Sequence, residues 1–281
     1  MNHQFSLLQD VYLENSFISS DAFYHHANMC EYCSYRKSDA FFRDKNWRGN
    51  RMPSLIRPSL NKKKANLILG HSDQFTGIKR VLSLRFLGYR NICGINVVKF
   101  KNLSMPIPIG ITNNTNESEY HRLFGNNELL VKANQVDFLT QSNRLVYGCF
   151  SIKTNKKERL PLAKLLLQSN HTFEEPEFTI DGRIRYLENL RQYAFTACPV
   201  GNGIDTHRLW EVLYMGGIPI IIQNRILESM LEDLPFVLVR NWEQIKDEKF
   251  LQDSWDKLSN RQNYNFNKLR IDYWINLIHS R

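Results

Sequence analysis

The sequence predicts an α/β protein built on parallel β-sheets, and three observations lead to that class. Short apolar runs and helix-like periodic segments alternate from residue 145 to residue 239. The run Ile218–Ile222 is apolar without interruption, as in strands that are buried on both faces of a parallel sheet. A glycine-containing turn, residues 201–203, joins one apolar run to a periodic segment. Strands and helices that alternate at this spacing favour a doubly wound sheet.

Individual elements follow from the same patterns. We expect strands at residues 65–70, 94–100, 145–150, 194–198, 218–222 and 236–239. We expect helices at residues 158–168, 186–193 and 207–215, and a helical, aromatic-rich tail at residues 255–278. Gly216 and Gly217 end the third helix. A polar, turn-rich passage follows Ile107. We therefore predict two domains, residues 1–140 and residues 141–281.

Composition excludes the disordered and fibrous classes. The chain has 281 residues, of which 42% are hydrophobic, and only 9 are Pro. Its 37 Lys and Arg exceed its 28 Asp and Glu, and the excess is concentrated in residues 1–125, with 17 basic and 9 acidic residues. A basic surface favours an anionic partner. The absence of an apolar span or export signal, together with five cysteines, predicts a cytoplasmic protein with reduced thiols.

A basic stretch in the N-terminal part of the chain allows two hypotheses. It could contact an anionic membrane surface or an acidic glycan, or it could be a solvated loop. Its members are Arg48, Arg51, Arg57, Lys62, Lys63 and Lys64. No recognition-module signature accompanies them, so we expect no specific nucleic-acid partner. His25, His26, Cys30 and Cys33 allow a structural zinc site, but one Cys-x-x-Cys without a second pair favours plain thiols.

The segment from Gly201 to Glu211 carries the chemistry. Glycine has no Cβ, so Gly201 and Gly203 permit a tight turn and a close approach to a ligand. A helix N-terminus behind such a turn offers free N–H groups and a positive dipole end to a phosphate. The planar guanidinium of Arg208 suits phosphate oxygens. Glu211 lies one turn further on the same helical face, where a carboxylate can accept hydrogen bonds from vicinal ribose hydroxyls.

Two common nucleotide motifs do not fit this segment. No lysine follows the glycines as in an ATPase P-loop, and the spacing differs from the dinucleotide-binding fingerprint. The remaining alternatives are a structural loop and a phosphate site. Asp205 and Thr206 are good N-cap residues, and their presence beside Arg208 and Glu211 favours the phosphate site.

The run Gly201-Asn-Gly-Ile-Asp-Thr-His-Arg-Leu-Trp-Glu211, followed by Gly217-Ile-Pro219, resembles the donor-binding signature of exostosin-like glycosyltransferases. Residues 147–155 with Arg159 look like the first strand and loop of the same domain, and the resemblance covers about residues 145–242. It implies a GT-B-like fold: two Rossmann-like domains facing across a cleft, with a C-terminal helix packing back on the first. It also implies metal-independent, inverting transfer from a nucleoside diphosphate sugar, with UDP favoured, to a glycan or lipid-linked acceptor.

The chain contains no Asp-x-Asp, the motif with which metal-dependent glycosyltransferases hold the donor diphosphate, so no metal or other cofactor is expected. The resemblance assigns donor binding to ten positions: Asn155, Arg159, Gly201, Asn202, Gly203, Asp205, Thr206, His207, Arg208 and Glu211. An inverting transfer needs a general base. Asp73 and His71, just past a predicted strand end, are the candidates.

Two rival hypotheses stay open. One is a binding module for nucleic acid or another polyanion, with the glycine loop purely structural. The other is a transferase-like protein that holds a nucleotide without turnover. The salt dependence of binding separates the first rival, because binding through many phosphates weakens steeply with salt.

Overall fold

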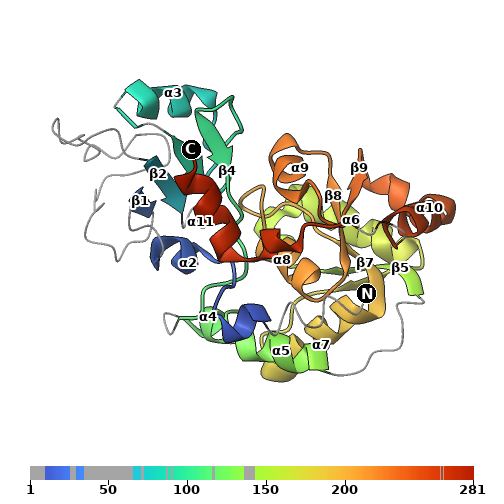
Figure 1. Ribbon diagram of the computed structural model, residues 1–281. Coiled ribbons are helices and arrows are strands. Elements are labelled where there is room, and N and C mark those ends of the chain that lie inside the picture. The colour runs from blue at the N-terminus through green and yellow to red at the C-terminus, as the bar shows by residue number, and fades with distance from the viewer. Residues whose placement is uncertain are drawn as a thin grey trace.

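The computed structural model describes residues 10–25, 30–34, 66–70, 73–86, 88–89, 91–115, 118–135, 143–259, 261 and 263–281. Over these residues the protein is a mixed α/β structure with two parallel sheets, as the sequence predicts (Figure 1). The basic residues at positions 48, 51, 57 and 62–64 lie outside the described residues, as does His26. Only the backbone is described for Cys30 and Cys33.

The N-terminal sheet has four parallel strands in the order β1-β2-β3-β4. Their bounds are Cys30–Ser34, Asn66–Gly70, Ile92–Gly94 and Ser104–Pro106. The strand predicted at residues 94–100 is wrong, because the strand ends where that prediction begins. Asn96 has a left-handed backbone (φ 55°) that breaks an extended run, and the chain then makes a single bridge between Val97 and Thr76.

The C-terminal sheet has five parallel strands in the order β6-β5-β7-β8-β9. Their bounds are Asn143–Cys149 for β5, Thr172–Glu174 for β6, Tyr193–Ala197 for β7, Ile218–Ile222 for β8 and Val237–Val239 for β9. From β5 the chain first pairs outward to β6 and then crosses to β7 on the other side. The connections on the two sides of β5 therefore diverge, which makes the β5–β7 edge a topological switch point.

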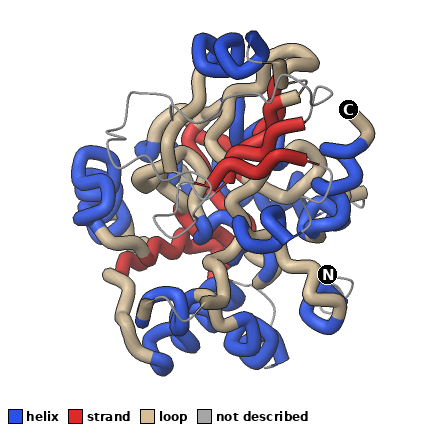
Figure 2. The backbone as a smooth tube through the Cα atoms, turned by 90° about the vertical axis from the view of Figure 1, so that its left-hand side faces the viewer, coloured by secondary structure: helices blue, strands red, loops and turns tan. Residues whose placement is uncertain are grey.

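Helices cover both faces of this sheet (Figure 2). On one face α6 (Lys156–Gln168) and α10 (Glu248–Ser259) pack against Val146, Phe195 and Ile220. On the other, α7 (Ile180–Gln192), α8 (His207–Tyr214) and α9 (Arg225–Leu231) pack against Tyr147 and Ile221. Tyr147 follows Val146 directly, so the two side chains point to opposite faces, as in any strand. The doubly wound arrangement explains why β8 contains only apolar residues.

The remaining elements are short, and their bounds complete the description. They are α2 (Ser20–His25), α3 (Ile78–Phe86), α4 (Glu119–Phe124), α5 (Asn127–Gln135), α11 (Ile271–His279) and the 3-10 turns η2 (Ile152–Asn155), η3 (Trp242–Lys246) and η4 (Phe266–Leu269). Helix α7 begins six residues before its predicted start, because Thr179 caps it by accepting a hydrogen bond from the backbone N–H of Gly182. The predicted single helical tail is divided among α10, η4 and α11.

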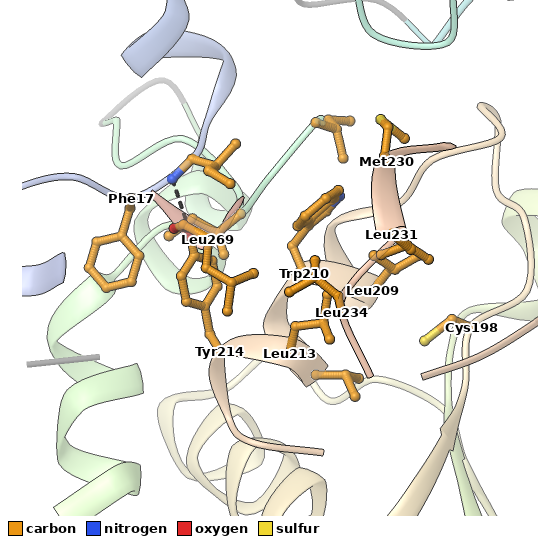
Figure 3. Close-up of a cluster of buried hydrophobic side chains, with 14 of the residues drawn as sticks. Phe17, Cys198, Leu209, Trp210, Leu213, Tyr214, Met230, Leu231, Leu234 and Leu269 are labelled. Atoms are coloured by element: carbon orange, nitrogen blue, oxygen red, sulfur yellow. Dashed lines mark hydrogen bonds between the residues drawn. The ribbon is translucent and has the colours of Figure 1, made fainter. Parts of the chain in front are cut away.

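The C-terminal helix α11 lies beside α2 and β2, next to the N-terminal sheet, as Figure 1 shows. The side chain of Asn66 donates a hydrogen bond to the carbonyl of Ile278. The predicted crossing of the chain end onto the N-terminal elements is therefore present. In the core nearby, the hydroxyl of Tyr214 donates to the carbonyl of Leu269 (2.6 Å) and accepts from the backbone N–H of Ile18 (3.0 Å) (Figure 3).

No helix among the described residues is long and apolar enough to cross a membrane.

Candidate functional site

A cavity of about 430 Å³ opens where the strands of the C-terminal sheet end. Ser151 follows β5, Pro176 follows β6, and the turn 201–203 follows β7, and all of them line it. Asp73, which follows β2 of the other sheet, lines it too. Open α/β sheets bind ligands outside the carboxyl ends of their strands at a switch point. This cavity occupies that position.

The glycines of the turn are required for close approach. Neither Gly201 nor Gly203 has a positive φ. A Cβ on Gly201 would lie 3.0 Å from Nη2 of Arg159, and one on Gly203 would lie 2.5 Å from Nδ2 of Asn96. Asn155 holds the turn by donating from Nδ2 to the carbonyl of Gly201 (3.1 Å), and it is not itself among the lining residues. The turn is thus fitted closely between two neighbouring segments.

Two arginines lie near this turn and against the same aromatic ring. The guanidinium carbons of Arg159 and Arg208 lie 5.8 Å and 5.7 Å from the centre of the Phe150 ring. Arg159 is held by the carbonyls of Val200 and Ser151, at 3.0 Å each. Burial and then the charge of Arg208 lower the pKa of Arg159 to about 10. Among the described residues neither arginine forms an ion pair, and Nε of Arg208 is buried without a hydrogen-bond partner.

This pair of like charges is therefore suited to bind an anion. Two neighbouring guanidiniums repel each other, and a buried donor without a partner costs free energy. A bound phosphate would relieve both costs at once, since it supplies opposite charge and acceptor oxygens. The start of α8 adds backbone N–H groups and the positive end of the helix dipole at the same place.

Glu211 is buried and oriented by two partners. Its Oε1 accepts from Nη2 of Arg183 at 2.6 Å, and its Oε2 accepts from the hydroxyl of Tyr186 at 2.8 Å. Burial opposes the charge, but Arg183 and the two hydrogen bonds hold the pKa of Glu211 below its ordinary value. A carboxylate has about four acceptor positions, so two remain for further donors from the cavity.

Asp205 joins the two halves of the chain. Its Oδ2 accepts from the backbone N–H of Ile109 at 2.7 Å, and Nε1 of Trp210 donates to both of its oxygens. The side chain of Asn96 accepts from the backbone N–H groups of Ile204 and Asp205, at 2.9 Å each. Asp205 lines the cavity, yet these contacts show that it also fixes the start of α8 against residues 96–109. The sequence contained no signal for Asn96.

The other predicted positions are less deeply engaged. His207 lines the cavity, and its Nδ1 donates to the carbonyl of Gly110 at 2.8 Å. Burial lowers its pKa, so near neutral pH the ring is uncharged and Nε2 is an acceptor. Asn202 is exposed and Thr206 is half-buried, and both line the cavity. Asp73 lines the cavity with an exposed side chain, whereas His71 lies outside the described residues.

An aromatic wall, which sequence reasoning missed, lines part of the cavity. We use the term for Tyr120, Phe124 and Phe178, which all line it. Tyr120 stacks on Phe124 with ring centres 4.7 Å apart, and Phe124 meets Phe178 edge-on at 5.5 Å. Phe178 is 63% exposed. Arg183 connects the wall to Glu211, since its guanidinium lies 5.0 Å from the Phe124 ring. The only sequence signal was the spacing of four between Tyr120 and Phe124.

The thiols near the cavity do not suit nucleophilic chemistry. Burial raises the pKa of Cys149 to about 11 and that of Cys198 to about 12, which keeps both protonated near neutral pH. In the part of the chain that the structure describes, no three His, Cys, Asp or Glu side chains are grouped as a metal site would require. The packing of Trp210 and Tyr214, 0% and 3% exposed, shows that both serve the core.

Comparisons with known proteins identify no family. No protein-family model matches the sequence, and no curated protein matches it. Among solved structures, the chain is similar to the crystal structure of an alpha1,3-fucosyltransferase, with 12% identity and a TM-score of 0.35. That match covers 77% of this chain and 80% of the other. A likeness at this level establishes neither membership nor activity.

The stability of the protein should fall between about pH 4 and pH 7 through Asp205. Burial raises the pKa of its carboxyl from 3.8 to about 7, although the N–H groups of Ile109 and Trp210 oppose this. In this window the folded state holds a proton that the unfolded state has lost, so stability declines as pH rises, by up to about 1.4 kcal/mol per pH unit.

Urea unfolding at pH 4, 5.5 and 7 measures the effect as the difference in the free energy of unfolding between wild type and Asp205→Asn. The variant has no titrating group at position 205. The stability of the wild type relative to Asp205→Asn should decline across the series. Asp233→Asn, at an exposed ion pair with Arg261, is the control and should leave the profile unchanged. A parallel pair of profiles for wild type and Asp205→Asn would contradict the raised pKa.

Proposed function

We propose that this protein is a glycosyltransferase that moves a sugar from a nucleoside diphosphate donor, with UDP favoured, to a glycan or lipid-linked acceptor. One observation carries the proposal: Arg159 and Arg208, neither in an ion pair among the described residues, lie against one aromatic ring beside a glycine turn and a helix start, at the switch point of a parallel sheet. The motif resemblance to exostosin-like enzymes supports it. The proposal includes a GT-B-like arrangement in which the N-terminal half provides the acceptor side.

The cavity offers the kinds of chemical group that a nucleotide needs. The arginine pair, Glu211 and the aromatic wall all line it, and Arg183 contacts both Glu211 and the Phe124 ring. We assign the diphosphate to the arginines and the ribose hydroxyls to the two remaining acceptor positions of Glu211. The planar nucleobase would stack on the wall, since aromatic faces favour offset stacking.

In the proposed inverting reaction, the acceptor oxygen attacks the anomeric carbon while the bond from that carbon to the diphosphate oxygen breaks. The acceptor proton passes to the carboxylate of Asp73, which lines the cavity from the N-terminal half. Arg208, Arg159 and the start of α8 stabilise the charge that develops on the departing diphosphate. We propose that these groups provide that stabilisation without a metal ion.

A ligand panel followed by a turnover assay tests the proposal. UDP and a UDP-sugar should each raise the melting temperature, and pyrophosphate or uridine alone should raise it less, because each fills only part of the cavity. Asp73→Asn should keep UDP binding and lower UDP release from the UDP-sugar by about 100-fold or more. An unchanged release rate would remove Asp73 as the base, and no melting shift with any nucleotide would contradict the donor site itself.

A further inference from the structure

Helix α3 presents a row of apolar side chains to solvent. Ile78, Leu82 and Phe86 are 43%, 47% and 93% exposed, and Phe75 just before the helix is 55% exposed. The three helical residues are spaced by four, which places them within an arc of about 80° on one face. We call these four side chains the α3 face. In Figure 1 the helix lies at the top of the view, above the N-terminal sheet.

The α3 face is separate from the side of the helix that packs against the sheet. Val81 and Leu84 are buried and join Leu67, Ile92 and Val97 in the core beneath the sheet. A surface helix needs only that one apolar stripe to fold against its sheet. A second apolar row in water is unfavourable unless something covers it, and contiguous exposed apolar surface is typical of an interaction site.

Positive charge predominates along the chain near the α3 face. Residues 73–115 contain six Lys or Arg and one acid, Asp73. Lys79 is exposed on the helix itself. Lys99 and Lys101 are exposed on the segment that pairs with Thr76, directly beside the start of the helix. The occupant of this surface is therefore apolar at its contact and negatively charged around it.

We propose that the α3 face docks the protein on a membrane that contains anionic lipids. Aliphatic side chains such as Ile78 and Leu82 enter the boundary between headgroups and acyl chains, while neighbouring lysines meet anionic headgroups. A nucleic acid fits less well, since it offers phosphates and stacking bases but nothing that pairs with exposed leucine and isoleucine. Charge complementarity thus favours lipid over the other polyanions.

This docking does not depend on the proposed function, but it would fix the orientation of the cavity relative to the membrane. Phe75 follows Asp73 by two residues, so the membrane contact begins beside the part of the cavity that the N-terminal half contributes. A lipid-linked acceptor would then lie near the cavity opening. Membrane binding can be present whether or not the cavity holds a nucleotide, and the two proposals can fail separately.

Vesicle co-sedimentation of the full chain tests the docking. We expect binding to vesicles with about 30% phosphatidylserine, little binding to pure phosphatidylcholine, and weaker binding when NaCl rises from about 0.1 to about 0.5 M. The double variant Leu82→Ser/Phe86→Ser should reduce partitioning by roughly tenfold or more. Leu167→Ser, at a leucine of α6 that is 63% exposed, is the matched control and should bind like wild type.

Three results would overturn the proposal. The first is the absence of binding to anionic vesicles, and the second is binding that the double variant leaves unchanged. The third is a dimer in sedimentation velocity that the double variant dissociates, which would assign the α3 face to a second copy of the chain. In the first case, RNA that binds tightly to the wild type and equally tightly to the double variant would assign the cationic surface to a polyanion. The melting temperature of each variant, expected near that of wild type, confirms that the variants fold.

Discussion

Arg208→Ala should weaken UDP binding by about 100-fold without reducing the stability of the unliganded protein. Removing a cation that pairs with a desolvated ligand charge typically costs a few kcal/mol of binding free energy. In the unliganded protein, however, Arg208 has no ion-pair partner among the described residues; the carboxylate of Glu211 attracts it and the charge of Arg159 repels it. Truncating it removes both interactions at once, so stability should change little.

Calorimetric titration with UDP and urea unfolding measure the two halves of this prediction. Arg225→Ala, at an exposed arginine that begins α9, should change neither quantity. Arg208→Lys keeps the charge but loses the planar fork, and should fall between wild type and Arg208→Ala. Undiminished UDP binding in Arg208→Ala would contradict the phosphate assignment, and a clear loss of stability would give Arg208 a structural role instead.

Glu211→Ala should lower the free energy of unfolding by about 3–5 kcal/mol, the largest stability effect that we expect. The substitution leaves the guanidinium of Arg183, whose side chain is 0% exposed, buried without its counter-charge. Two of its nitrogens, Nε and Nη1, already lack partners among the described residues. The ribose assignment adds a second effect, a loss of nucleotide affinity. Urea unfolding near pH 7 measures the first, and titration with UDP measures the second.

A double variant separates packing from ligand recognition. In Arg183→Met/Glu211→Leu both charges are replaced by apolar side chains of similar size, which often restores the stability that a broken buried pair loses. We expect stability close to wild type together with weakened UDP binding. Full UDP affinity in this stable variant would show that the pair only packs the core. Because the pKa of Glu211 is held low, its contribution to stability is present above about pH 4.5 and declines as pH falls further.

Much of the C-terminal sheet could be predicted because each of its signals is local. The strand Ile218–Ile222 matches its prediction residue for residue, since an apolar run between Gly217 and Gln223 has few alternatives. The end of α8 was also predicted from the sequence, and Gly216 at that end has the positive φ of 78° that favours glycine. The false strand at residues 94–100 failed at Asn96, whose left-handed turn is stabilised by contacts with residues more than one hundred positions away.

The candidate site was predictable only along its own segment. Eight of residues 201–211 line one cavity because they form one turn and one helix face. The partners that shape their chemistry come from elsewhere: Arg183 lies 28 positions before Glu211, and the aromatic wall joins α4 to the loop before α7. Such pairings depend on how the helices pack on the sheet, which no local pattern encodes.

The hydrogen bonds across residues 204–207 have a consequence for motion. Four of them link this short stretch to Asn96, Ile109 and Gly110. Any hinge movement that separates the two sheets at this seam must break those links and release the same backbone that shapes the start of α8. Under the proposed function, separating the sheets at this seam and weakening the phosphate site would therefore occur together. Release of the nucleoside diphosphate and movement between the sheets would then share a single barrier.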